Sequence, residues 1–436
     1  MLSHLCYKKY IRKFILTIWI VIFSSISSNT QSYYFWLKSA DNTPENIQDI
    51  ESKLNIKLPI ISFIFDPRNK SDVLNSIDKI VDQLWTDRIY HFTVSPDSFS
   101  AEDVALWKFD EQYTAFFKKI KEKDLHVIFR TMHEMNWWRY PRASNPEKFK
   151  AAWIHVWTLS RVVWLREENI AFDFSVNHRD MPTKWIPSQS AQLIECSLSK
   201  KGCYHFEDYY PWDEFVDLIW FTFYNRWKAV DNRRWLSPTE ILYDKNWKTY
   251  ERLQKFWKPI IIDEVATTSV WYKWNYSYEK SRNEYLNVNN RKDYRLHQLR
   301  EFLIDHPEIV ATIYFNCDYT HGLNFIVQWE ADRAIVNLQD DKTYAWFRDL
   351  ELFGEKRLDD ALKTIFHLWR IKVDNNDILI SSQCMKEISV ISSLIEQKAE
   401  TIDEKVKLLN TLQEIDWGSE CISKSLNALM NVYTKG

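Results

Sequence analysis

Glycine is scarce in this chain, which has five glycines but 22 tryptophans among its 436 residues. Soluble domains ordinarily contain roughly 7% glycine. Helix ends and tight turns often need a positive φ angle, which glycine adopts more readily than any other residue. The shortage excludes glycine from most of the turns that an α/β protein of this length requires.

A net excess of basic charge is lacking as well. The formal net charge is −3 at pH 7, so no basic field favours binding to nucleic acid. The sequence also has no glycine-rich phosphate loop, no His-Glu-x-x-His motif and no cysteine spacing typical of a zinc site. We therefore expect no nucleotide, flavin or metal cofactor and no nucleic-acid partner.

Long apolar runs are missing, and the N-terminal run Phe14–Phe23 is too short for a comfortable transmembrane helix. It follows the basic segment 8–13 and precedes the serine-rich segment 24–28, which is the layout of a secretory signal. We expect residues 1–28 to be a signal peptide and the protein to be secreted or held at the cell envelope. An uncleaved membrane anchor is the alternative.

Short apolar runs separated by helical patterns fill most of the chain. We expect strands near residues 33–38, 58–65, 88–94, 126–132, 170–176, 216–223, 259–264 and 309–316. Helical patterns lie between them, for example at 110–123, 146–165, 238–257 and 291–305. This alternation predicts an α/β fold, a (β/α)₈ barrel, over residues 30–354. Residues 355–436 show no strand signal, and we expect a small C-terminal helical appendage there.

Several tryptophans stand where glycine is expected. Trp257 lies at the usual place of a helix C-cap, Trp212 lies in a turn before a strand, and Trp137 follows a strand directly. One hypothesis is that many of these residues are glycines, encoded by UGA codons that the host organism reads as glycine. The alternative is a protein that is truly rich in tryptophan and poor in glycine.

Two of the predicted strands each deliver a glutamate at the carboxyl end. Glu134 follows the strand at 126–132 within a group of polar side chains, Arg130, His133 and Asn136. Glu264 ends the apolar run at 259–264. Parallel barrels gather their active sites at the carboxyl ends of the strands. Two carboxylates at one barrel mouth are the requirement for glycoside cleavage.

The segment 129–136, Phe-Arg-Thr-Met-His-Glu-Met-Asn, resembles the acid/base motif of glycoside hydrolase family 26, a family of mannanases. Further similarities follow in order along residues 90–330. They are Asn169–Asn177, which resembles the fifth strand; Tyr209–Asp217 and Phe221–Asn225, which resemble the sixth-strand region; and Lys258–Glu264, which resembles the nucleophile strand. The family usually has glycine where this chain has Trp137, Trp212, Trp220 and Trp257.

The resemblance implies roles for individual residues. Glu134 is expected to be the general acid/base and Glu264 the nucleophile. The expected substrate-binding residues are Arg130, His133, Asn136, Asn177 and Tyr224, of which Tyr224 also hydrogen-bonds Glu264. From the residues alone, Tyr224 fits a core tyrosine equally, and Arg130 fits a counterion of buried carboxylates. His91 is a weaker ligand candidate.

Together these features predict a retaining glycoside hydrolase acting on a β-linked polysaccharide, most like β-1,4-mannan. A related glycanase acting on a mixed-linkage glucan or an exopolysaccharide is one alternative. A non-catalytic carbohydrate-binding barrel is another. The expected partner is the polysaccharide, and the N-terminal segment or the helical tail is a candidate for envelope attachment.

Overall fold

The structure is a computed structural model of the chain. It describes residues 34–39, 43–180, 204–225, 237–267 and 298–316, together with parts of 362–430, each with short gaps. The predicted signal peptide lies outside these residues. None of the described helices has the length and apolar character needed to cross a membrane.

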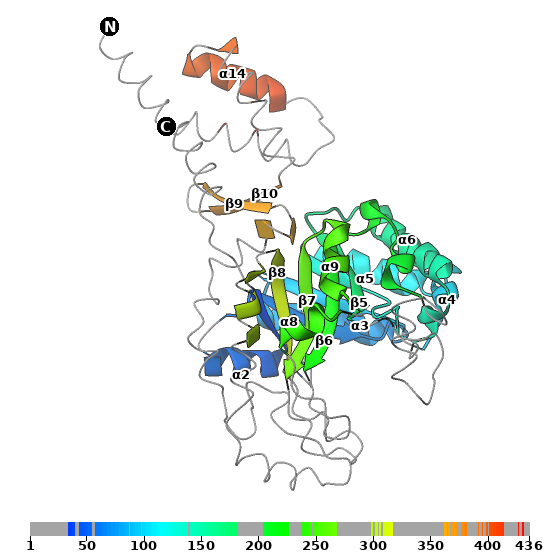
Figure 1. Ribbon diagram of the computed structural model, residues 1–436. Coiled ribbons are helices and arrows are strands. Elements are labelled where there is room, and N and C mark those ends of the chain that lie inside the picture. The colour runs from blue at the N-terminus through cyan, green and yellow to red at the C-terminus, as the bar shows by residue number, and fades with distance from the viewer. Residues whose placement is uncertain are drawn as a thin grey trace, which may run out of the picture. The chain divides into compact units, whose positions relative to one another are not determined.

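Eight parallel strands close into a barrel in chain order, which confirms the predicted (β/α)₈ fold (Figure 1). Each strand falls within a few residues of its expected place. The strands are β1 (Tyr34–Ser39), β2 (Ile60–Phe65), β3 (Ile89–Val94), β4 (His126–Arg130), β5 (Ile170–Asn177), β6 (Leu218–Asn225), β7 (Ile260–Thr267) and β8 (Ile309–Asn316).

Alternation along each strand divides the apolar side chains between two cores. On β4, Phe129 belongs to the large cluster between strands and helices, where its ring lies 5.1 Å from that of Phe117 on α5. Ile128 belongs to a second cluster inside the barrel. This two-sided burial explains why the strands are near-continuous apolar runs in the sequence.

Helices surround the strands on the outside (Figure 1). Asn145 caps the start of α6, since its side chain accepts a hydrogen bond from the backbone N–H of Lys148. The helices that flank the first five strands are α2 (Pro44–Leu54), α3 (Lys70–Leu84), α4 (Ala101–Ala105), α5 (Asp110–Glu122) and α6 (Pro146–Val162). Short 3₁₀ turns are η1 (Pro141–Ser144), η2 (Phe206–Tyr209) and η3 (Asp213–Phe215).

The single helix predicted over 238–257 is wrong. The chain forms α8 (Pro238–Leu242), α9 (Thr249–Leu253) and the 3₁₀ turn η5 (Gln254–Phe256). The break is a turn in which the carbonyl of Asp244 accepts hydrogen bonds from the N–H groups of Trp247 and Lys248, at 3.1 and 2.8 Å. Lys248 then takes a left-handed backbone with φ 47°. The helix predicted over 291–305 lies largely outside the described residues.

The expectation of a tail without strands is also wrong. Strands β9 (Leu368–Val373) and β10 (Asn376–Ser381) pair antiparallel, and the helix α14 (Ile402–Gln413) follows. Leu362, Ile365 and Phe366 join the apolar cluster inside the barrel. The ring of Phe366 lies 5.6 Å from that of His126, the first residue of β4. The start of the tail therefore caps the amino-terminal end of the barrel, and the domain boundary at 354/355 stays a prediction.

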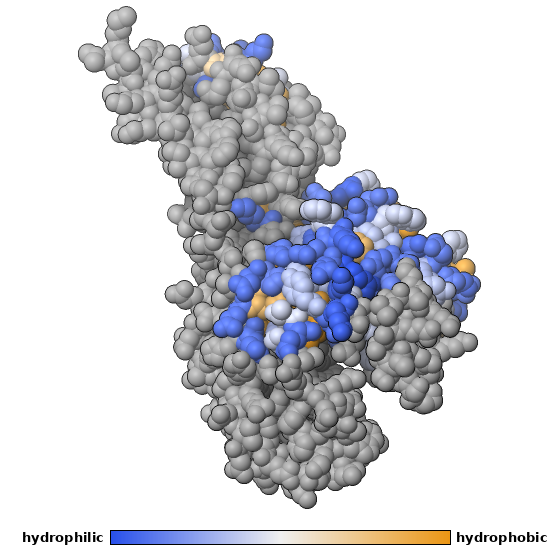
Figure 2. All heavy atoms as spheres, in the orientation of Figure 1, coloured by the Kyte–Doolittle hydropathy of each residue, from blue (hydrophilic) through white to orange (hydrophobic). Residues whose placement is uncertain are grey.

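Hydrophilic residues cover most of the described part of the face in Figure 2, and hydrophobic residues form small separate spots there. This distribution is expected of the outer sides of helices that surround a barrel.

Candidate active site

The backbone beyond β4 turns sharply and carries Glu134 into a buried position. Met132 and Glu134 both have positive φ angles, 46° and 51°. The backbone N–H of Glu134 donates to the carbonyl of Ser175 on the neighbouring strand β5, at 2.8 Å. Left-handed residues other than glycine cost of order 1–3 kcal/mol each and collect at functional sites. The loop is therefore held in a demanding conformation that directs one carboxyl group to the carboxyl end of the barrel.

The side chain of Glu134 is held from the end of β5. The amide Nδ2 of Asn177 donates to Oε1 of Glu134 at 2.9 Å. Asn136 in turn fixes Asn177, because its side chain accepts from the backbone N–H of Asn177 and donates to its carbonyl, both at 2.9 Å. Two of the predicted substrate-binding residues thus make hydrogen bonds within the protein that orient the predicted acid/base.

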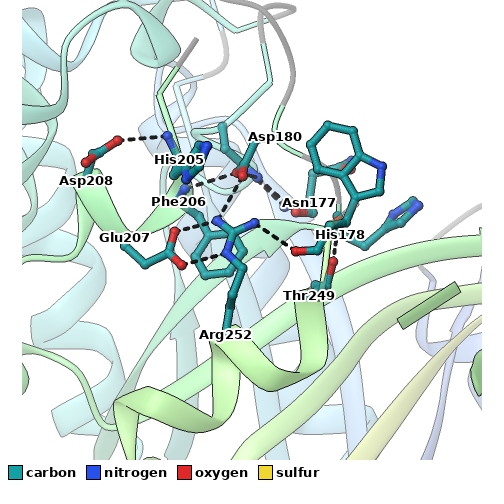
Figure 3. Close-up of polar contacts among 11 residues, drawn as sticks. Asn177, His178, Asp180, His205, Phe206, Glu207, Asp208, Thr249 and Arg252 are labelled. Carbon is teal, nitrogen blue, oxygen red and sulfur yellow. Dashed lines mark hydrogen bonds and ion pairs between the residues drawn. The ribbon is translucent and has the colours of Figure 1, made fainter. Parts of the chain in front are cut away.

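An ion-pair cluster around Asp180 and Arg252 continues this network (Figure 3). Nδ2 of Asn136 donates to Oδ1 of Asp180 at 3.0 Å. Arg252 of α9 contacts the other carboxylate oxygen of Asp180 at 2.8 Å. Arg252 also donates from Nε to Glu207 at 2.6 Å, and its guanidinium lies over the ring of Phe206.

The charges in this cluster shift one another's pKa values. Burial raises the pKa of Asp180, although Arg252 and Asn136 act in the opposite direction. Burial also acts to raise the pKa of Glu207, but its hydrogen bond and ion pair with Arg252 outweigh that effect and lower it. The two carboxylates raise the pKa of Arg252 against the effect of its burial. The guanidinium charge of Arg252 therefore favours the ionised form of both carboxyl groups in the cluster.

His133 faces a second group of side chains. Nε of Arg142 donates to the carbonyl of His133 at 2.8 Å, and its NH2 group lies 3.5 Å from Nδ1 of the imidazole. Oη of Tyr140 lies 3.3 Å from Nε2. Because a guanidinium only donates, Nδ1 of His133 can only be the acceptor in its contact with Arg142.

A fully buried polar layer lies inside the barrel below these loops. Arg130 donates from Nε to Oγ1 of Thr93 at 2.7 Å. Nε2 of His91 lies 3.2 Å from Oδ2 of Asp173, and Nδ1 of His91 lies 2.7 Å from Oγ of Ser62. Burial raises the pKa of Asp173 well above its usual range, and the charge of Arg130 acts against that rise.

These contacts favour the view of Arg130 as a counterion of a buried carboxylate. His91 is 0% exposed, so it has no surface for a ligand in this structure, and the suggestion that it is a ligand is not supported.

Glu264 lies on β7, where the strand carries an extra residue relative to both neighbours. Thr222 pairs with Asp263 and Tyr224 with Ala266 on one side. Ile262 pairs with Thr312 and Val265 with Tyr314 on the other. Such bulges are frequent beside active sites, where they redirect a side chain. The side chains of Glu264 and Tyr224 lie outside the described residues.

The structure thus brings together Arg130, His133, Glu134, Asn136 and Asn177 at the ends of two adjacent strands. Four residues of these networks were not predicted from the sequence: Asp173, Asp180, Arg142 and Arg252. Asp173 had a readable signal, since it is a charged residue inside the apolar run of β5. The others come from loops and a helix, and no local pattern connects them. Within the described residues, no cluster of His, Cys, Asp or Glu could hold a metal ion.

In sequence, the chain matches no family model and no curated protein. In structure, it is similar to several solved glycoside hydrolases, mostly of family 26. One is the endo-β-1,4-mannanase of Cellulomonas fimi, in a double mutant (11% identity, TM-score 0.45, covering 76% of this chain and 72% of that one). Another is the family 26 domain of an endo-β-mannanase/endo-β-glucanase from Prevotella bryantii (10%, 0.42, 76% and 93%). A third is a family 26 protein of a Muricauda species (14%, 0.39, 68% and 87%).

Proposed function

We propose that this protein is a retaining glycoside hydrolase that cleaves a β-linked polysaccharide, with β-1,4-mannan as the preferred class of substrate. The observation that carries the proposal is the setting of Glu134. It is a buried carboxyl group on a left-handed backbone at the carboxyl end of a parallel barrel, oriented by Asn177. A second glutamate, Glu264, lies at a bulge near the same end of β7.

In the proposed reaction, Glu134 protonates the glycosidic oxygen of the departing sugar while Glu264 attacks the anomeric carbon. The C–O bond to the leaving group breaks, and a covalent glycosyl ester forms on Glu264. Glu134, now a carboxylate, takes a proton from water, which attacks the anomeric carbon and releases Glu264. No cofactor is required for either step.

Two of the supporting residues are too buried to contact a sugar. Arg130 is 0% and Asn136 1% exposed, which leaves them almost no surface for a sugar. In our proposal they position Glu134 and balance buried charge. His133 and Tyr224 remain the proposed contacts to the sugar under attack, and Asn177 is proposed to act on both Glu134 and the substrate.

The proposal extends to where the protein acts. A polysaccharide of this kind lies outside the cell membrane, so the N-terminal segment 1–28 is proposed to direct export. In this proposal the N-terminal segment or the C-terminal tail attaches the enzyme to the envelope.

Reducing-sugar release from a panel of mannan, mixed-linkage glucan and an exopolysaccharide tests the proposal. We expect the unaltered chain to release sugar most rapidly from mannan. The Glu264→Ala variant should lose turnover but still bind the polysaccharide. As a control, Glu122→Ala removes an exposed carboxylate on α5 and should leave the rate unchanged. Binding by the unaltered chain without release of sugar from any glycan would instead identify a carbohydrate-binding barrel.

A further inference from the structure

Tryptophan dominates the left-handed backbone positions of the described chain. Nine residues other than glycine have positive φ there, and five of the nine are tryptophan. These five, called the left-handed tryptophans below, are Trp85, Trp107, Trp164, Trp212 and Trp257. Large side chains avoid this region because Cβ then approaches the following carbonyl oxygen. Tryptophan has no chemical reason to prefer it.

Two of these residues occupy the glycine position of a helix C-terminal motif. After α4, the N–H of Trp107 donates to the carbonyl of Val104, and the next N–H, that of Lys108, donates to Asp103. After α6, Trp164 and Leu165 repeat the arrangement, donating to Arg161 and Ser160 at 3.0 and 3.1 Å. In this pair of bonds the residue at the position of Trp107 and Trp164 is usually glycine.

The remaining three have equally demanding backbones. Trp85 has φ 69° and ψ 168°, and Trp212 has φ 75° and ψ 159°. That region of the backbone map is populated almost entirely by glycine. Trp257 has φ 54° and ψ 29°, the left-handed helical conformation, directly after η5.

The side chains of the left-handed tryptophans are also much more exposed than that of Trp153, a tryptophan packed in the core. The left-handed tryptophans are 55–93% exposed. Trp153 of α6 is 0% exposed, its Nε1–H donates to the carbonyl of Phe215 at 2.9 Å, and its ring meets Phe172 and Phe174 edge-on. A buried indole with a satisfied N–H is the ordinary setting of tryptophan.

We infer that the left-handed tryptophans are glycines in the protein as its own host makes it. Their codons are UGA, which that host translates as glycine, whereas Trp153 is encoded by UGG. This assignment doubles the number of glycines and gives α4 and α6 their usual C-terminal residue. It is independent of the proposed enzymatic function.

The codons and the native protein test the inference directly. We expect UGA at all five positions and UGG at 153, and peptides of the protein from its host should carry glycine at the five positions. UGG codons there, or tryptophan in the native peptides, would overturn the inference.

Thermal unfolding of the full chain provides a second test. Replacing all five left-handed tryptophans by glycine should raise Tm by at least several degrees. The matched variant with alanine at the same positions also removes the indoles but keeps Cβ, so its Tm should stay well below that of the glycine variant. Trp153→Gly should lower Tm. Equal Tm values for the glycine and alanine variants would contradict the backbone argument.

Discussion

The side-chain amide of Asn177 donates a 2.9 Å hydrogen bond to Oε1 of Glu134. The two residues come from different segments, Asn177 from the last position of β5 and Glu134 from the loop after β4. Asn136 holds the backbone of Asn177 on both its N–H and its carbonyl. The orientation of the proposed acid/base is thus set by the neighbouring strand as well as by its own loop.

The first prediction concerns this hydrogen bond. Asn177→Ala should lower kcat/KM roughly 10- to 100-fold, the value expected for a hydrogen bond to a charged group. A donor to a carboxylate favours its ionised form, so removing it should move the alkaline limb of the pH–rate profile to higher pH. Steady-state kinetics across pH measure both effects.

Asn75→Ala is the matched control, because Asn75 is exposed on α3. Its pH profile should coincide with that of the unaltered chain. If Asn177→Ala slows the reaction and leaves the alkaline limb in place, Asn177 acts on the substrate alone.

The second prediction concerns Arg252, whose guanidinium contacts the carboxylates of both Asp180 and Glu207. Arg252→Met leaves the buried carboxylate of Asp180 without its cation, and the free energy of unfolding should fall by about 3–5 kcal/mol. Arg68→Met breaks an ion pair whose two side chains are about half exposed and should cost less than about 1 kcal/mol. Urea unfolding of both variants at neutral pH makes the comparison.

The loss in Arg252→Met should shrink as the pH falls toward about 4, the usual pKa of an aspartate in an unfolded chain. Protonated Asp180 no longer needs a cation. Equal losses in the two arginine variants would show that the cluster adds no stability beyond that of a surface pair.

The third prediction concerns Asp173, which faces His91 and Arg130 inside the barrel. Burial raises its pKa in the folded state, so the folded protein binds this proton more tightly than the unfolded chain does. The resulting contribution to stability is complete below about pH 4 and is lost as the pH rises through the raised pKa. Asp173→Asn removes this pH dependence.

Thermal unfolding between pH 4 and 8 measures the difference. The stability deficit of Asp173→Asn relative to the unaltered chain should narrow as the pH rises. A deficit that widens with pH would mean that Arg130 and His91 outweigh burial and hold Asp173 ionised.

The strands of the barrel were predictable because both of their faces are buried. Runs such as Ile60–Phe65 and Ile89–Val94 are apolar on the helix-facing side, which leaves a strong local signal. Their inward side begins with an isoleucine but also carries Ser62, His91 and Thr93, so it contributes less to that signal. The position of Glu134 at the barrel mouth was predictable for a related reason, since polar residues directly beyond a buried strand reach that end of the barrel. The hydrogen bond from Asn177 was not, because it depends on the register between β4 and β5.

The helix predicted over 238–257, the missed strands of the tail and the missed ion pair of Asp180 each have a physical cause. The helical pattern over 238–257 hid the turn at Asp244, whose carbonyl hydrogen bonds break the helix. In the tail, the sequence pair Asp374-Asn375 separates two short strand-like runs, and the helical pattern of charged and apolar residues around them in the sequence masked that signal. Asp180 and Arg252 are far apart in sequence, so only the closed fold shows that they pair.

The proposed reaction passes through a covalent glycosyl ester on Glu264, which forms with Glu134 as the acid and is hydrolysed with Glu134 as the base. Incubating the Glu134→Ala variant with an aryl β-glycoside whose leaving group needs no protonation should let Glu264 attack while the hydrolysis of the ester stalls. Mass spectrometry of the digested protein then locates the sugar. We expect one glycosyl group on the peptide that contains Glu264. An adduct on a different carboxylate, or turnover with no adduct at any time, would rule out Glu264 as the nucleophile.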